Sequence, residues 1–316
     1  MLQRFLSFGQ SATSPGTAGA WLAIAVGILM LVPGQAATAS VTDAQLGPGE
    51  GAGARAPAPA IRHGPEVSFQ LDEFYIHVPA NPPVPMRVLL AFNGMGGTGQ
   101  QEAGQLAPQI GDRGWVTVAP TYDYGNWWDT NRVIQEEKDH LPRITALLDD
   151  LPGLLGGPVD SQVLVYGFSR GAQTANRWAL AFPERVAAVA VASGGAYTLP
   201  RTWVGDEASP LNFPFGVADL RAVVGHGFDS ARFNAIPFWI GVGGQDTDTR
   251  VVPPNWGVYL GENRVERAQR FADWLGRSGA RVQFQIFAEL GHEQTDALAG
   301  AALDFLDQAT SGAFYS

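Results

Sequence analysis

Short runs of apolar residues recur along the chain between residues 88 and 242. They occupy 88–92, 115–119, 163–166, 186–192 and 237–242, and nearly every position in each run is apolar. Continuous runs of this length are typical of parallel strands that are buried on both faces of a sheet. The sequence therefore predicts a buried parallel strand at each of these ranges.

The stretch just before these runs has a different pattern. Apolar and polar residues alternate over 67–71 and again over 74–78. A period of two is expected when one face of a strand packs on a core and the other faces water. The pattern predicts two antiparallel strands at the start of the folded part of the chain.

Helical patterns separate most of the predicted strands. Apolar residues recur at near-helical spacing over 131–150, 172–182, 265–275 and 298–306, and Pro183 closes the second of these stretches. Strands that alternate with helices predict an α/β fold with a mostly parallel sheet. In such sheets ligands bind at the carboxyl ends of the strands, so the residues that follow each apolar run are the candidates for chemistry.

The N-terminus carries a separate signal. Arg4 precedes the apolar run 20–32, and the small residues Ala-Thr-Ala at 37–39 follow it. The run is shorter than the about 20 residues of a comfortable transmembrane span. We expect residues 1–39 to be a signal peptide, so that a secreted mature protein begins at Ser40. The alternative is an uncleaved N-terminal membrane anchor, and a membrane is a partner only in that case.

The chain divides into two further parts after this segment. Residues 40–65 are rich in Ala, Gly and Pro and show no apolar periodicity, which predicts a disordered linker. We expect residues 66–316 to form one folded domain. An irregular segment at about 200–235 interrupts the alternation of strands and helices, and we expect it to be a short insertion that caps the site.

Composition removes several classes of function. The 316 residues carry a net charge of −10, and the basic residues, almost all Arg, are scattered along the chain. Such a chain lacks the basic cluster that binds nucleic acid, and we expect no nucleic-acid partner. Cysteine is absent, which excludes disulfides, thiolate nucleophiles and cysteine-based metal sites. We expect no metal and no cofactor.

One serine stands between two glycines directly after a predicted strand. The stretch VLVYGFSRGAQ at 163–173 places Ser169 between Gly167 and Gly171, before residues that suit a helix. In one interpretation Ser169 only caps that helix. In the other the glycines allow a turn so tight that the hydroxyl is presented at the sheet edge as a nucleophile.

A nucleophilic serine needs a base and an acid that orients the base. GGQD ends at Asp246 after the run 237–242, and His292 follows the stretch RVQFQIF within AELGHE. The order serine, acid, histidine, each after a strand, is the order of the α/β-hydrolase triad. Asp246 is favoured as the acid because it lies nearer to the strand end, and Asp248 remains the alternative. The other histidines, His63, His77, His140 and His226, are expected to be structural or solvated.

The turn after the run 88–92 is a candidate oxyanion hole. NGMGGTG at 93–99 is rich in glycine and can present backbone N–H groups to a developing negative charge. A plain flexible loop or a phosphate-binding turn are the other interpretations. The spacing of a dinucleotide-binding motif is not met and no P-loop lysine follows, so the sequence gives nucleotide binding little support.

From Val67 onward the sequence resembles the α/β-hydrolase superfamily, through FNGMGG, YGFSRGAQ, GVGGQD and LGHE. The resemblance implies Ser169 as nucleophile, His292 as base and an aspartate after the penultimate strand as acid. It also implies an oxyanion hole made by the backbone N–H groups of Met95 and Arg170. Many members have histidine where this chain has Asn93, and that residue usually orders the loop.

The loop after the run 115–119 is aromatic. PTYDYGNWWD contains Tyr122, Tyr124, Trp127 and Trp128, which are candidates to line a pocket for an acyl, aryl or sugar-linked group. Core packing of the loop is the alternative for each of the four. Since cap and loop residues determine specificity more than the triad does, the sequence leaves the substrate open.

The pattern as a whole favours a secreted serine esterase that acts on a small-molecule or polymeric ester. GFSRGA followed by FPERVAAVAVASGG is similar to secreted polyester depolymerases and feruloyl esterases. A serine peptidase of the prolyl-oligopeptidase type, which shares the hydrolase core, is the alternative. A non-catalytic binding protein on the same scaffold is the third hypothesis, and the presence of the serine, acid and histidine positions argues against it.

Overall fold

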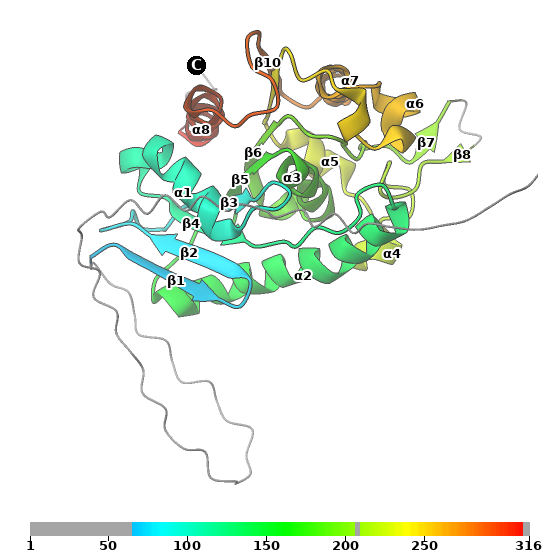
Figure 1. Cartoon of the computed structure of the whole chain (residues 1–316). Coiled ribbons are helices and arrows are strands. Elements are labelled where there is room, and N and C mark those ends of the chain that lie inside the picture. The colour runs from blue at the N-terminus through cyan, green and yellow to red at the C-terminus, as the bar shows by residue number, and fades with distance from the viewer. Residues whose placement is uncertain (1–64, 206–208, 312–316) are drawn as a thin grey trace, which may run out of the picture. The chain divides into compact units, whose positions relative to one another are not determined.

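A computed structural model describes residues 65–205 and 209–311 (Figure 1). The expected signal peptide (1–39) and all but the last residue of the expected linker (40–65) lie outside the described residues. The described part of the chain forms one eight-stranded sheet with helices on both of its faces, and a separate pair of short strands. Within this part no helix is both long enough and apolar enough to cross a lipid bilayer.

Eight strands form the sheet, in the order β1-β2-β4-β3-β5-β6-β9-β10. Their bounds are β1 Val67–Leu71, β2 Phe74–Val78, β3 Val88–Phe92, β4 Val116–Pro120, β5 Val163–Phe168, β6 Val186–Ala192, β9 Phe238–Gly243 and β10 Val282–Phe287. β2 pairs antiparallel with both β1 and β4, and all other neighbours are parallel. The predicted mostly parallel α/β fold is confirmed, as are the two antiparallel strands at its start.

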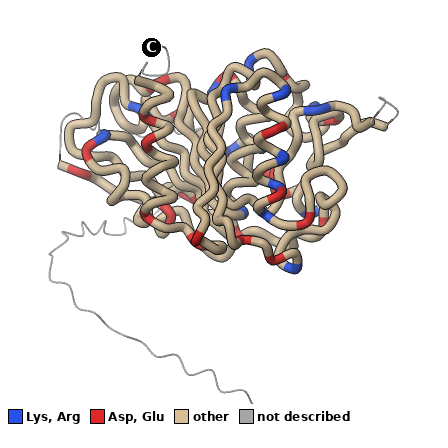
Figure 2. The backbone as a smooth tube through the Cα atoms, turned by 90° about the horizontal axis from the view of Figure 1, so that it is seen from above, with Lys and Arg blue, Asp and Glu red and all other residues tan. Residues whose placement is uncertain are grey.

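None of the eight strands contains a charged residue. β3, β4 and β5 are buried at every position, which explains why they are almost entirely apolar instead of alternating, with Thr117 of β4 as a buried polar residue. Figure 2 shows the consequence: blue and red segments are interspersed around the periphery, and the strands at the centre are tan. The scattered charge expected from the sequence is seen in the described residues.

Two apolar layers cover the sheet, one on each face. The layer under α1 (Gly99–Ile110) and α8 (Asp296–Thr310) is separate from the larger layer under α2 (Thr130–Leu155), α3 (Arg170–Ala181) and α7 (Arg264–Arg277) (Figure 1). The short elements are η1 Gly111–Arg113, η2 Pro183–Arg185, η3 Thr249–Val251, η4 Pro254–Trp256 and α6 Gly257–Leu260.

α1 is the one long helix that the sequence analysis did not predict. Thr98 caps it: the hydroxyl accepts from the N–H of Gln101, and the Gln101 side chain accepts from the N–H of Thr98 at 2.9 Å. This reciprocal pair satisfies two backbone donors at the helix start. The sequence T-G-Q-Q at 98–101 is therefore the signal that marks the start of this helix. The helix was missed because its few apolar residues show no clear helical period.

The insertion at about 200–235 contains β7 (Trp203–Val204), β8 (Ser209–Pro210), α4 (Arg221–Val224) and α5 (Ser230–Ala235). β7 and β8 pair with each other and not with the main sheet. α4 contacts α2, and α5 contacts η2. Leu211, Phe213, Val217, Leu220 and Phe233 join the larger apolar layer, so this segment is part of the core packing on that face.

The turn from β5 into α3 has no room for side chains beside Ser169. A methyl group on Gly167 would overlap the carbonyl of Gly171, and a methyl group on Gly171 would overlap the carbonyl oxygen of Phe92. Ser169 itself has φ 55° and ψ −116°, a conformation that is costly for a residue with a side chain. Close backbone contact on both sides therefore holds the serine in this strained conformation.

Gly171→Ala is expected to lower the free energy of unfolding by about 1–3 kcal/mol or more, because the new methyl group forces apart α3 and the end of β3. Urea unfolding followed by circular dichroism measures the change. Gly276→Ala in α7 is the control, since no atom lies within 4 Å of the added methyl group. This variant should be at least as stable as the parent; an equal loss in both variants would contradict the packing argument.

Candidate active site

A cleft of about 1020 Å³ lies at the carboxyl ends of the parallel strands. Its lining includes residues that follow β3, β4, β5, β6, β9 and β10, among them Gly94, Met95, Trp127, Ser169, Gly195, Val251, Pro253 and His292. This is the edge of the sheet at which parallel α/β folds bind ligands. The sequence-predicted serine and histidine both lie in it.

Ser169 Oγ and His292 Nε2 are 2.8 Å apart. The ring of His292 stacks on that of Phe168, with centroids 5.1 Å apart and an angle of 28° between the planes. About a third of the His292 side chain is exposed to solvent. The strained turn and the aromatic contact together hold a hydroxyl and an imidazole nitrogen in hydrogen-bond contact at the floor of an open cleft.

The second nitrogen of the imidazole, Nδ1, is 2.7 Å from Asp246 Oδ2. The other carboxylate oxygen of Asp246 accepts from Arg264 Nη1 at 3.2 Å, and only 3% of Asp246 is exposed. A carboxylate can only accept, so Nδ1 carries the proton and Nε2 is left free to accept from the serine hydroxyl. Asp246 thereby determines the tautomer of His292.

Backbone contacts join the loop that carries the acid to the loop that carries the histidine. The N–H of Gln245 donates to Leu290 O at 2.9 Å, and the N–H of Gly244 donates to Phe287 O at 2.8 Å. A methyl group on Gly243 would overlap the carbonyl oxygen of Gly291. The distance between the carboxylate and the imidazole is therefore set by the backbone as well as by the side chains.

Asp248, the alternative acid, lies elsewhere. Its carboxylate accepts from the Arg250 side chain at 2.9 and 2.8 Å and from the Arg250 N–H at 2.9 Å, which caps η3. These hydrogen bonds from Arg250 lower the pKa of Asp248 to about 2. Both oxygens of the exposed carboxylate are engaged with a neighbour two residues away, and His292 is bonded to Asp246 instead.

The glycine-rich turn after β3 approaches the serine closely. A methyl group on Gly94 would lie 3.9 Å from Ser169 Cβ, and both Met95 and Arg170 line the cleft. Arg170 is the first residue of α3, so its N–H is one of those without a carbonyl partner inside the helix. The N–H groups of Met95 and Arg170 thus belong to the two segments that flank the hydroxyl.

Asn93 is fully buried and orders this turn. Many members of the superfamily that the sequence resembles have histidine at this position. Asn93 Nδ2 donates to Gly94 O and Gly97 O, each at 2.9 Å, and Asn93 Oδ1 accepts from the N–H of Tyr122 at 3.1 Å. One side chain therefore bonds to both sides of the glycine-rich turn and to the loop after β4. The departure from histidine leaves the loop-ordering role intact.

The four aromatic candidates separate into two groups. Tyr122 is 2% exposed and packs in the core, and the ring of Tyr124 lies under the Arg170 guanidinium at 4.7 Å. Trp127 lines the cleft, and Trp128 packs against it with ring centroids 4.7 Å apart. Of the four, only Trp127 lines the cleft. The loop turns both tyrosines inward, where Tyr122 packs in the core and Tyr124 packs against Arg170.

The insertion at about 200–235, expected to cap the site, contributes no described residue to the lining of the cleft around Ser169. The apolar side chains of this insertion are buried against the α2 and α3 layer instead of facing the opening. The described part of the insertion thus packs on the α2 and α3 side of the domain, and its role as a cap stays a prediction.

The other histidines that the structure describes do not line the cleft. His63 lies outside the described residues, His77 on β2 contacts the Ser68 hydroxyl, and His140 on α2 packs against the ring of Tyr122. His226 is half-buried and packs edge-on against the ring of Phe182. Burial lowers the pKa of His140. No group of three or more His, Asp or Glu side chains in the described residues is arranged to hold a metal ion.

Several buried polar residues around the cleft were not candidates from the sequence. Arg264 and Gln173 line it, and the Arg170 side chain donates to Glu136 at 2.9 Å. All of them lie on helices, where a polar residue is expected to face solvent. The sequence contains no signal for their burial, because burial depends on how these helices pack against the rest of the domain.

Glu102 is a further unexpected residue of the cleft. Its carboxylate accepts from Gln294 Nε2 at 3.0 Å, which links α1 to the segment after His292. Burial raises its pKa from the ordinary 4.5 to about 7, and the hydrogen bond from Gln294 offsets part of that shift. Glu102 is therefore protonated in the folded protein at mildly acidic pH, where it is ionised in the unfolded chain.

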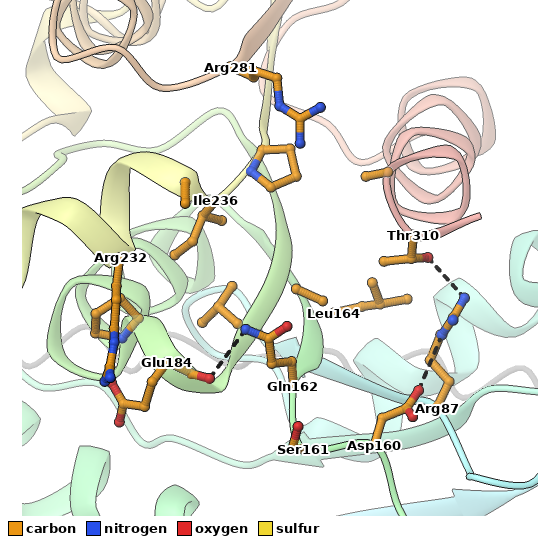
Figure 3. A pocket seen from close by; sticks show the side chains of 16 residues that line it. Arg87, Asp160, Ser161, Gln162, Leu164, Glu184, Arg232, Ile236, Arg281 and Thr310 are labelled. Atoms are coloured by element: carbon orange, nitrogen blue, oxygen red, sulfur yellow. Dashed lines mark hydrogen bonds and ion pairs between the residues drawn. The ribbon is translucent and has the colours of Figure 1, made fainter. Parts of the chain in front are cut away.

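A second hollow, of about 780 Å³, lies at the opposite edge of the sheet (Figure 3). It is lined by the starts of β5 and β6 and by charged side chains that already have partners: Arg87 bonds to Thr310 at 2.9 Å and pairs with Asp160. Neither member of the Ser169–His292 pair lines it. This hollow lies at the amino ends of the parallel strands, whereas ligands in this architecture bind at the carboxyl ends.

Glu102→Gln should stabilise the protein in a pH-dependent way. Because the folded pKa lies above the unfolded one, Glu102 reduces stability increasingly as pH rises from about 4.5 to about 7, by about 3 kcal/mol in full. The gain in Tm of Glu102→Gln over the parent should therefore grow across this window and stay constant above it. Glu184→Gln, at an exposed site, is the control; a gain independent of pH would contradict the assignment.

Comparisons with known proteins bear on the fold. No family model and no curated protein matches the sequence. Among solved structures, the chain is similar to poly(aspartic acid) hydrolase-1 from Sphingomonas sp. KT-1, with a TM-score of 0.59 and 16% identity over 80% of this chain and 99% of that one. It is also similar to LpqC, a poly(3-hydroxybutyrate) depolymerase from Bordetella parapertussis, with a TM-score of 0.58 and 21% identity over 79% and 90%.

A third similar structure is TT1662 from Thermus thermophilus, with a TM-score of 0.53 and 16% identity over 78% of this chain and 98% of that one. At these identities the likeness establishes an architecture and no activity. The sheet order, the positions of the helices and these similarities agree. The chain has the α/β-hydrolase fold.

Proposed function

We propose that this protein is a serine hydrolase that cleaves carboxylic esters through an acyl-enzyme on Ser169. The observation that carries the proposal is the continuous hydrogen-bonded series from the Ser169 hydroxyl through His292 to the buried carboxylate of Asp246. A serine capping a helix needs no histidine, and a structural histidine needs no serine in a strained turn. The arrangement is the one that activates a hydroxyl for acyl transfer.

In the first half of the reaction Ser169 Oγ attacks the ester carbonyl carbon while His292 Nε2 accepts the hydroxyl proton. The negative charge that develops on the carbonyl oxygen is stabilised by the N–H groups of Met95 and Arg170. His292 then gives its proton to the alkoxy oxygen as the carbon–oxygen bond breaks. The alcohol leaves, and the acyl group stays on Ser169.

In the second half a water molecule replaces the alcohol. His292 Nε2 accepts one of its protons as the oxygen attacks the acyl carbon, and then returns a proton to Ser169 Oγ as the acid departs. Asp246 stabilises the imidazolium at both stages without itself becoming protonated. Arg264 keeps the Asp246 carboxylate in place through its second oxygen at 3.2 Å.

Two observations support an ester substrate, either a small molecule or a polymer: the size of the cleft and the activities for which the similar structures are named. The cleft of about 1020 Å³ exceeds the size of a simple acetyl ester, and Trp127 provides an apolar wall. Two of the similar structures are described as a depolymerase of poly(3-hydroxybutyrate) and a hydrolase of poly(aspartic acid). We propose further that the protein is secreted, on the strength of the N-terminal sequence alone.

Ser169→Ala should fold as the parent does, because the substitution removes one hydroxyl at the top of a turn, and should reduce kcat by several orders of magnitude. A fluorophosphonate probe should label the parent at Ser169, located by peptide mass spectrometry, and should leave Ser169→Ala unlabelled. Turnover of p-nitrophenyl esters and aminoacyl amides distinguishes the reactions. Amide cleavage without ester cleavage would favour a serine peptidase, and absence of labelling would favour a binding protein.

Asp246→Asn and Asp248→Asn form a matched pair that tests the orienting acid. Asp246→Asn should lower kcat by about four orders of magnitude with the fold retained, because the neutral amide favours the wrong tautomer of His292. Asp248→Asn alters only the capped turn with Arg250 and should cost far less. A larger loss in Asp248→Asn would show that the acid is Asp248.

The expected secretion is tested by N-terminal sequencing of protein recovered from the culture medium and from the cell fraction. Mature protein in the medium should begin at Ser40, after the Ala-Thr-Ala stretch. A cell-bound product that retains residues 1–39 would show a membrane anchor instead.

A further inference from the structure

One part of the cleft lining is formed by two segments that are distant along the chain, α1 and the residues directly after His292. Gln294 Nε2 donates to Glu102 Oε1 at 3.0 Å, and this hydrogen bond joins the two segments. We call this part the polar wall of the cleft. It consists of Gln101, Glu102, Gly104, Gln105, Glu293 and Gln294.

The side chains of the polar wall are amides and carboxyl groups, and none of them is basic or apolar. An amide both donates and accepts hydrogen bonds, and a carboxylate accepts them. Elsewhere the lining is apolar: Met95, Trp127 and Val251 belong to it, and Met95 and Val251 are 48% and 42% exposed. The cleft therefore has one part suited to polar groups and another suited to hydrocarbon.

Gly104 keeps the α1 part of the polar wall open. It shares one face of the helix with Gln101 and Gln105, which lie three residues before it and one after it. Glycine inside a helix is less stable than alanine, but a methyl group on Gly104 would have no atom within 4 Å. Packing within the described residues therefore gives no reason for this glycine, and its effect is to leave space in the cleft beside two amides.

The polar wall adjoins the base of the proposed reaction. His292 Nε2 gives its proton to the alkoxy oxygen, so the alcohol part of the ester must leave from beside His292. Glu293 and Gln294 follow this histidine directly, and the hydrogen bond from Gln294 to Glu102 holds α1 next to them. The alcohol part of the substrate is thus the part that faces the polar wall.

We propose that the polar wall binds the alcohol part of the ester substrate and selects polyols, that is, alcohols with further hydroxyl groups. This inference rests on the proposed esterase function and adds the class of alcohol to it. A hydroxyl group donates and accepts a hydrogen bond, as the amides of the polar wall do. An alkyl alcohol displaces water from these amides without replacing its hydrogen bonds, and is therefore disfavoured.

The experiment compares 2,3-dihydroxypropyl butanoate with propyl butanoate, which differ only in the hydroxyl groups of the alcohol. Initial rates in a pH-stat give kcat/KM for each ester. Division by the rate constant of alkaline hydrolysis corrects for the reactivity of the leaving group. The corrected ratio of the dihydroxypropyl to the propyl ester should be about ten in the parent, as expected for hydrogen bonds to the added hydroxyl groups. A ratio of one or below would overturn the inference.

A double variant, Gln105→Leu with Glu293→Leu, tests whether the polar wall causes the preference. Both side chains are exposed, so the fold should be retained. The corrected ratio should fall by about tenfold, toward one. Gln100→Leu with Glu184→Leu is the matched control, because it makes the same two changes at exposed positions outside the lining of the cleft. The control should keep the ratio of the parent.

Gly104→Leu separates a filled subsite from a damaged fold. Leucine favours a helix more than glycine does, so Tm should rise, whereas the corrected ratio should fall because the side chain occupies the open face of the polar wall. Gly276→Leu on α7 is the control, since it also has no atom within 4 Å of the added carbon. It should raise Tm and leave the ratio unchanged. A lower Tm in Gly104→Leu alone would show that this glycine is structural.

The remaining outcomes distinguish this inference from the esterase proposal. Butanoylcholine has a cationic alcohol; a corrected kcat/KM above that of the dihydroxypropyl ester, lost in the double variant, would show that the polar wall selects cations and would overturn the inference. Hydrolysis with a ratio that no variant changes overturns the inference and leaves the esterase proposal standing. Absence of hydrolysis of all three esters overturns the inference, and absence of probe labelling at Ser169 as well overturns the esterase proposal.

Discussion

The close backbone contact between the start of α3 and the ends of β3 and β5 is the constraint on which the site depends. Neither Gly167 nor Gly171 has room for a methyl group, so the helix begins almost in contact with the sheet. Ser169 takes a positive φ of 55° in consequence. The strain at this one residue is sustained by the extensive buried surface of three strands and a helix.

Buried charges then fix how α3 lies against α2. Arg177 bonds to Glu137 at 2.7 Å and Arg170 bonds to Glu136 at 2.9 Å, with all four side chains almost entirely buried. Removing one member of such a pair leaves an uncompensated charge, so the network specifies one register between the two helices. The same arginines orient the amide of Gln173, so a structural network determines which atom of that residue faces the cleft.

The sequence was sufficient for most of the sheet, because strands buried on both faces are apolar at nearly every position. The predicted run 115–119 is displaced by only one residue from β4, and the serine, histidine and Asp246 lie together after three different strands. Their catalytic roles stay predictions. Strand ends of a parallel sheet converge at one edge, which is why residues 46 and 123 positions apart were identifiable as neighbours.

Long-range contacts decided what the sequence left open. Tyr122 and Tyr124 follow a strand end as Trp127 does, but the loop turns them inward, and nothing in the local pattern distinguishes the three. The apolar residues of the insertion at about 200–235 show no clear period, so the sequence did not predict which of them would pack against the rest of the domain. Glu102, Gln173 and Arg264 are polar residues on helices, and only the packing of those helices in the folded domain reveals that they are buried.

The hydrogen bonds of Asn93 have a thermodynamic consequence for any reaction at Ser169. Because one buried amide bonds to Gly94, Gly97 and the N–H of Tyr122, the glycine-rich turn is ordered in the free protein. The conformational entropy of that turn is lost during folding and not during substrate binding. In the proposed mechanism its N–H dipoles are thus preorganised, and stabilisation of the developing oxyanion requires little reorganisation at the moment of bond formation.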